Sequence, residues 1–101
     1  MSEINSKIKS KEMDLFFEAI LKLENLEECY YFFEDVATIN EVKSLAQRMH
    51  VAKLLNEKKT YTEIVEITGA STATISRVNR CLNYGSDGYS LLLERIRKDE
   101  E

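Results

Sequence analysis

The chain has 101 residues, of which 44% are hydrophobic and 32% charged, and its formal net charge is −4. This length suits one small domain, and the composition is typical of a soluble globular protein rather than a disordered one. No apolar run approaches transmembrane length, and the N-terminus lacks the apolar core of a signal peptide, so we expect a cytoplasmic protein without membrane contact. Cys29 and Cys81 have no CxxC spacing and no nearby ligand cluster, which predicts two buried, reduced thiols and no metal site.

The first third of the chain predicts two helices. One runs over about Lys11–Glu24. Asn25 then resembles an N-cap, with Glu28 as its capping-box partner, and opens a second helix that reaches about Val36. The centre of this second helix reads CYYFF and is apolar nearly all round, so it must be covered on more than one side. We favour a second copy of the chain as the cover, and a central place in a monomeric bundle is the alternative.

A third helix follows the capping box made by Thr38 and Glu41, and it should reach Leu55. Apolar residues recur on one of its faces at helical spacing, namely Val42, Leu45, Met49 and Ala52.

Residues 61–82 have the spacing of a helix-turn-helix. Ile64, Ile75 and Val78 occupy the positions that pack its two helices together. Gly69 occupies the tight turn, where glycine adopts a positive φ without steric cost. Such a unit lays its second helix in the DNA major groove, so the segment predicts binding to double-stranded DNA.

The polar side chains of this helix-turn-helix fall into two groups, those that cap its helices and those that face outward and could contact DNA. Thr60 with Glu63 caps the first helix, and Ser71 caps the second. None of the outward residues is a long side chain suited to a bidentate base contact near the start of the second helix, which predicts readout through water bridges and DNA shape. The predicted DNA-binding residues are Lys58, Lys59, Tyr61, Thr62, Ser71, Thr72, Ala73, Ser76 and Arg80.

The second helix of this unit should end near Tyr84, and a turn at residues 85–88 leads to a last helix from about Tyr89. Residues 1–10 and 99–101 are polar and should be loose. No alternating strand pattern competes with the helical ones. We therefore expect a single all-α domain of about six helices over residues 1–101.

Charge and chemistry separate three classes of function. The segment from Lys43 to Arg80 carries seven basic and three acidic side chains, a net +4 within an otherwise acidic chain, which favours phosphate contacts. The acidic total and acidic N-terminal helices favour the alternative, a protein-interaction module that has lost DNA binding. An enzyme is disfavoured, because the chain has one His, no convergent carboxylates and no glycine-rich phosphate loop.

The stretch TGASTATISRVNRCLNYG and the preceding LAQRMHVAKLL resemble the Trp repressor superfamily, and the whole chain is most similar to its small members of the YerC/YecD type. The resemblance implies six helices in an intertwined homodimer that acts as a transcription regulator. Some related members control amino-acid biosynthesis genes, which implies a repressor of amino-acid metabolism.

The resemblance also implies an effector site for a small amino acid, at Thr38, Arg48 and Arg77. Arg can pair a carboxylate bidentately and stack on a ring. Val78 and Cys81 stand where tryptophan-binding members have a small Gly and a Ser, which argues against tryptophan. Another amino acid such as histidine, no ligand, and a structural role in which the arginines pair with Glu41, Glu63 or Glu66 stay open.

Overall fold

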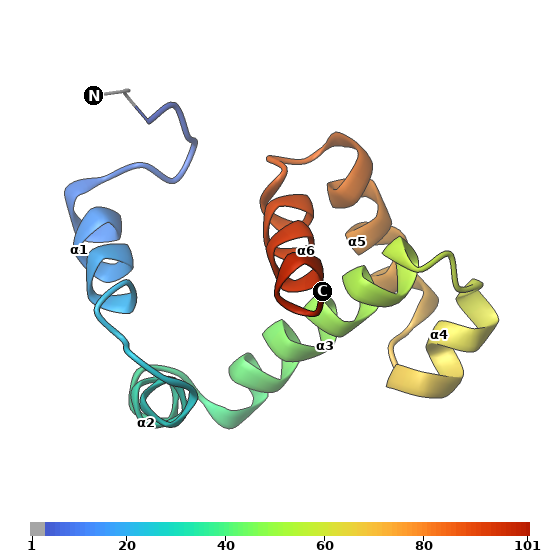
Figure 1. Ribbon diagram of the computed structural model, residues 1–101, viewed down its shortest axis with the longest axis horizontal. Helices are drawn as coiled ribbons and strands as arrows, with labels where there is room; N and C mark the ends of the chain where they lie inside the picture. Colours follow the sequence, from blue (N-terminus) through green and yellow to red (C-terminus); the bar gives the residue numbers. More distant parts are fainter. Residues whose placement is uncertain (1–3) are drawn as a thin grey trace. The chain divides into compact units, whose positions relative to one another are not determined.

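The computed structural model describes residues 4–101, and this part of the chain contains six α-helices and no strand (Figure 1). The predicted all-α class is therefore confirmed. The chain divides after Thr38 into two compact units, residues 1–38 and 39–101. Residues 1–3, which belong to the segment expected to be loose, lie outside the described residues, and residues 4–10 contain no helix.

Helix α1 spans Lys11–Ile20 and begins where the hydroxyl of Ser10 accepts the N–H of Met13 at 3.0 Å. It ends before the predicted Glu24. The N–H groups of Lys22 and Leu23 donate to carbonyls three residues earlier, so the helix tightens and stops. Asn25 must then adopt an extended backbone, with φ −157°, to cap the following helix.

Helix α2 spans Leu26–Val36, as predicted. The side chain of Asn25 accepts the N–H of Glu28 at 2.9 Å, which confirms the N-cap. The reciprocal bond of a capping box is shifted by one residue, because the Glu28 carboxylate accepts the N–H of Glu24, also at 2.9 Å, and not that of Asn25.

The apolar side chains of α1 and α2 are poorly covered. The rings of Phe16 and Phe32 pack with their centroids 6.0 Å apart and join the two helices. Even so, no side chain among residues 4–38 is buried, and Tyr30 is 63% exposed. This unit therefore leaves apolar surface that its own two helices do not cover.

The second unit contains α3 (Ile39–Asn56), α4 (Tyr61–Thr68), α5 (Thr72–Tyr84) and α6 (Gly88–Asp99). Figure 1 shows α4, α5 and α6 gathered around α3 within this unit. Its core contains every buried side chain of residues 4–101, namely Val51, Ala52, Leu54, Ile64, Ala70, Ile75, Val78 and Leu93.

Only the C-terminal half of α3 contributes buried residues to this core. The predicted apolar face of α3 is thus buried at Ala52 but not at Leu45, which is 50% exposed. The reason is that the core residues of the other three helices pack around Val51–Leu54. The N-terminal half of α3 keeps apolar surface that its own unit does not bury.

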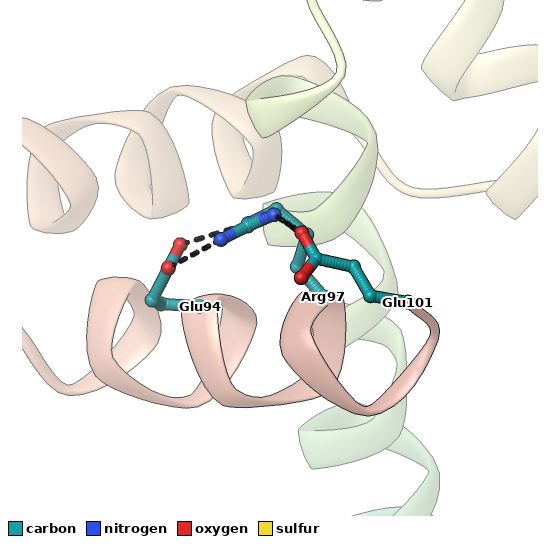
Figure 2. Close-up of polar contacts among 3 residues, drawn as sticks. All are labelled: Glu94, Arg97 and Glu101. Carbon is teal, nitrogen blue, oxygen red and sulfur yellow. Dashed lines mark hydrogen bonds and ion pairs between the residues drawn. The ribbon is translucent and has the colours of Figure 1, made fainter.

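Helix α6 carries ion pairs on its exposed face. Figure 2 shows the guanidinium of Arg97 between the carboxylates of Glu94 and Glu101. The bond to Arg97 lowers the pKa of Glu94, and the two carboxylates raise the pKa of Arg97. Because these groups are exposed to solvent, the pairs contribute little to stability, and the packing of Leu93 holds the helix in place.

The cysteines differ from the prediction. Cys29 is half-buried and Cys81 is exposed, so the expectation of two buried thiols is wrong for Cys81. Cys81 lies on α5 three residues after Val78, at the edge of the core-facing side, and one residue before the half-buried Leu82. None of the helices formed by residues 4–101 combines the length and hydropathy that crossing a bilayer requires.

Candidate DNA-binding surface

The two helices of the predicted helix-turn-helix are α4 and α5, and their packing is the one the spacing predicts. Ile64 and Ile75 are 0% exposed and Val78 is 1% exposed. Gly69 has φ +73°, as predicted for the turn. A Cβ at Gly69 would meet no atom within 4 Å, so backbone conformation alone, and not crowding, requires glycine there.

Hydrogen bonds fix the turn between these helices. The hydroxyl of Thr68 donates to the carbonyl of Ile64 at 2.7 Å and accepts the N–H of Ala70 at 3.1 Å. Nε2 of Gln47, on α3, donates to the carbonyl of Thr68 at 3.2 Å. Gln47 was not among the predicted residues, because no local pattern signals a bond between residues 21 apart.

Both helices carry the predicted caps. Thr60 and Glu63 form a capping box, in which the hydroxyl accepts the N–H of Glu63 at 3.2 Å and the carboxylate accepts the N–H of Thr60 at 3.1 Å. Hydrogen bonds from the backbone N–H and then the side chain of Thr60 lower the pKa of the Glu63 carboxyl, and nearby Lys59 lowers it further. Ser71 caps α5 by accepting the N–H of Thr74 at 3.1 Å. The carboxylate of Glu63 is thus used in the helix cap, although it lies close to the basic residues Lys58 and Lys59.

The connector before α4 presents two lysines on a tightly bonded turn. Lys58 adopts φ +66°, the left-handed conformation that usually requires glycine. The N–H groups of Lys58 and Lys59 donate to the carbonyls of Leu55 and Leu54, at 3.0 and 3.1 Å. This is the Schellman pattern of a helix end, and it places both lysines directly before the first turn of α4.

All of the predicted DNA-binding residues are exposed to solvent. Those at the start of α4 flank its capping box, and those on α5 lie opposite its buried residues. Among residues 4–101, no ion pair neutralises Lys58 or Arg80. The exposed residues are Lys58, Lys59, Tyr61, Thr62, Ser71, Thr72, Ala73, Ser76 and Arg80. We call this set the reading surface.

The predicted effector residues differ from one another in burial. Arg77 is exposed on α5, and Thr38 is exposed at the end of the first unit. Arg48 is half-buried on α3 and lines an open hollow of ≈ 390 Å³ with Asn40, Glu41, Ser44 and Leu45. The ion pairs within residues 4–101 do not include Arg48 or Arg77. The effector role and the structural role of these two arginines both stay predictions.

Comparison with known proteins identifies the family. The family model described as Trp repressor protein matches residues 11–97. The chain belongs to the Trp repressor family. The uncharacterized protein YerC of Bacillus subtilis (strain 168) is 57% identical over 94 residues, which cover 93% of this chain and 90% of the relative. A crystal structure of a TrpR-like protein from Eubacterium eligens ATCC 27750 superposes with a TM-score of 0.87 at 60% identity, covering 91% of this chain and 95% of that one.

The Trp repressor family is one of DNA-binding regulators, and the helix-turn-helix described above is the part of this chain suited to DNA. The resemblance inferred from the motif around Gly69 is therefore confirmed at the level of the family. The individual reading-surface and effector residues stay predictions.

Proposed function

We propose that this protein is a dimeric, sequence-specific transcription regulator that represses amino-acid metabolism genes by occupying their promoters in the cytoplasm. The observation that carries the proposal is the division of side chains on α4 and α5. Ile64, Ile75 and Val78 of these helices are buried in the core, and the reading surface is exposed as a set. Short polar side chains at the start of α5 can approach base edges, and the lysines before α4 can meet phosphates.

The homodimer is supported by apolar surface that the first unit, taken by itself, leaves uncovered. In the first unit, Leu15, Leu21, Leu26 and Tyr30 are each more than 60% exposed. A helix pair with so little burial needs a partner surface. Two reading surfaces related by a two-fold axis would suit half-sites about one DNA turn, ~34 Å, apart.

Effector control is the finer part of the proposal. Arg48 and Arg77 have guanidinium groups that no carboxylate of residues 4–101 pairs, and a free amino acid offers a carboxylate of the right charge. With Thr38 they are the proposed effector residues. A ligand there would act by favouring the DNA-binding arrangement of the two reading surfaces over others.

The decisive experiment is selection of bound sequences from a random duplex pool, repeated with each of the twenty amino acids. We expect an enriched near-palindrome with half-sites one helical turn apart. Dependence of the enrichment on one amino acid would identify the effector. A folded, dimeric protein that enriches no sequence under any condition would contradict the proposal.

The acidic charge of the chain favours one competing function, a protein-interaction module that does not bind DNA. Salt titration of duplex binding separates the two, because phosphate contacts make affinity fall steeply with salt. Replacing Lys58 and Arg80 together with alanine should abolish binding by a regulator. Replacing Arg95 and Lys98, which lie on α6 outside the reading surface, removes the same charge and is the matched control.

A further inference from the structure

One polar side chain of α3 reaches the turn of the helix-turn-helix. Gln47 is partly buried, and its Nε2 donates to the carbonyl oxygen of Thr68 at 3.2 Å. The other side-chain hydrogen bonds that start or end on α4 and α5 are local and join residues at most four apart. Within residues 4–101, the bond from Gln47 is therefore the directional link between α3 and the helix-turn-helix that carries the reading surface.

The acceptor of this bond has no substitute partner in the turn. Thr68 is the last residue of α4, so its carbonyl lies beyond the hydrogen-bond ladder of that helix. The hydroxyl of Thr68 is already engaged with Ile64 and Ala70. Losing the Gln47 amide would leave a partly buried carbonyl unpaired, which costs more than the bond itself contributes.

Core packing and this bond act differently on the orientation of α5. Hydrophobic burial holds the helices together, but it depends on area and has little directional preference. A hydrogen bond weakens steeply when its angle changes. The bonded carbonyl lies three residues before Ser71, the N-cap of α5. We infer that Gln47 is a positioning residue, which sets the orientation of the recognition helix α5 relative to α3 and thereby the sequence selectivity of DNA binding.

The inference rests on the proposed function and makes a specific claim about it. Phosphate contacts through long lysine side chains tolerate a small reorientation of α5, because four-carbon stems adjust. Base contacts through Ser, Thr and Ala do not tolerate such a reorientation, because these short side chains cannot extend to a base that has moved away. Loss of the Gln47 bond should therefore lower specific affinity while non-specific affinity and its salt dependence stay unchanged.

The test uses the full-length protein with three variants. Gln47→Met removes the donor at nearly constant volume, and Gln47→Lys restores an N–H donor on a side chain of similar length. Leu93→Val lowers stability from α6 without a polar change, so it controls for destabilisation. The measured quantity is the ratio of affinities for the selected operator and a scrambled duplex, at several salt concentrations. Amide hydrogen exchange at residues 69–72 reports independently on the turn.

We expect Gln47→Met to lower the affinity ratio at least about fivefold, the factor one net hydrogen bond supplies. The salt slope should stay constant and exchange at residues 69–72 should rise, while Gln47→Lys and Leu93→Val keep the ratio within about twofold. An unchanged ratio in Gln47→Met, an equal fall in Leu93→Val, or no rescue by Gln47→Lys would overturn the inference and leave the proposed function standing. A wild-type protein that does not distinguish the duplexes would overturn both.

Discussion

Lys58 occupies the position after the end of α3 that is ordinarily glycine. Replacing it tests two separate effects, the strain of its backbone on stability and the contact of its side chain with DNA. Its φ of +66° lies in the left-handed region, which costs a non-glycine residue roughly 1–2 kcal/mol. Glycine removes that cost but adds about 0.5–1 kcal/mol of unfolded-state freedom. We expect Lys58→Gly to raise the free energy of unfolding by about 0.5–1 kcal/mol, a rise of about 2–8 °C in Tm.

The same substitution removes one charge from each reading surface. If Lys58 contacts a phosphate, the slope of log affinity against log salt should become shallower by about 0.9 per reading surface. The variant should therefore be more stable and bind DNA less tightly. Backbone strain often occurs at functional sites. Here a lysine would be kept in the left-handed conformation because its charge contributes to DNA binding, although glycine would be more stable there.

Thermal unfolding and salt-dependent duplex binding measure the two effects, and Lys58→Ala is the matched control. Alanine keeps the left-handed cost and loses the charge, so it should match Lys58→Gly in salt slope and the wild type in stability. If Lys58→Gly is no more stable than Lys58→Ala, the reasoning about strain is refuted. If neither variant changes the salt slope, Lys58 does not contact a phosphate.

Three further predictions concern stability. Gly85→Ala should destabilise by about 1–3 kcal/mol, because its Cβ would clash with the backbone carbonyl of Cys81. Gly88→Ala should be neutral or stabilising, because a Cβ there would meet nothing within 4 Å. Urea unfolding of both variants distinguishes a steric clash from a general intolerance of substitution in that loop. Ile75→Ala should cost about 2–5 kcal/mol in the same assay, and a smaller loss would mean that Ile75 is not a core residue. Glu63 has its pKa lowered from 4.5 by the Thr60 cap, so its contribution is present above pH 4.5 and is lost as pH falls through the folded-state pKa. Wild type and Glu63→Gln should accordingly differ in Tm at neutral pH and converge in acid, and a constant difference would show that the charge is irrelevant.

The sequence predicted the parts of the fold that depend on local rules. The bounds of α2, the Thr60–Glu63 capping box and the positive φ of Gly69 all follow from residues close together in the chain. The end of α1 was predicted too late, because its apolar pattern continues to Leu23 while the extended backbone needed at Asn25 stops the helix earlier.

The sequence predicted which residues of the candidate site are exposed, but not the hydrogen bond and the backbone conformation that shape the site. Helical spacing placed the reading surface opposite the buried residues of α5, since both follow the same 3.6-residue period. The bond from Gln47 to Thr68 was not predictable, because it depends on how α3 approaches the turn. The left-handed conformation of Lys58 was also missed, because the residue type gives no sign of it.

The restriction of buried side chains to residues 39–101, among those the structure describes, has a consequence for the time course of folding. The core around Ile64 can form within one chain, whereas in the proposed dimer the apolar side chains of α1 and α2 are covered only when two chains meet. The chain has no proline, so no slow prolyl isomerisation separates the two steps. Refolding should show one phase with a rate independent of protein concentration and a second that accelerates with it. Newly made chains would then acquire DNA binding after a delay set by their own concentration.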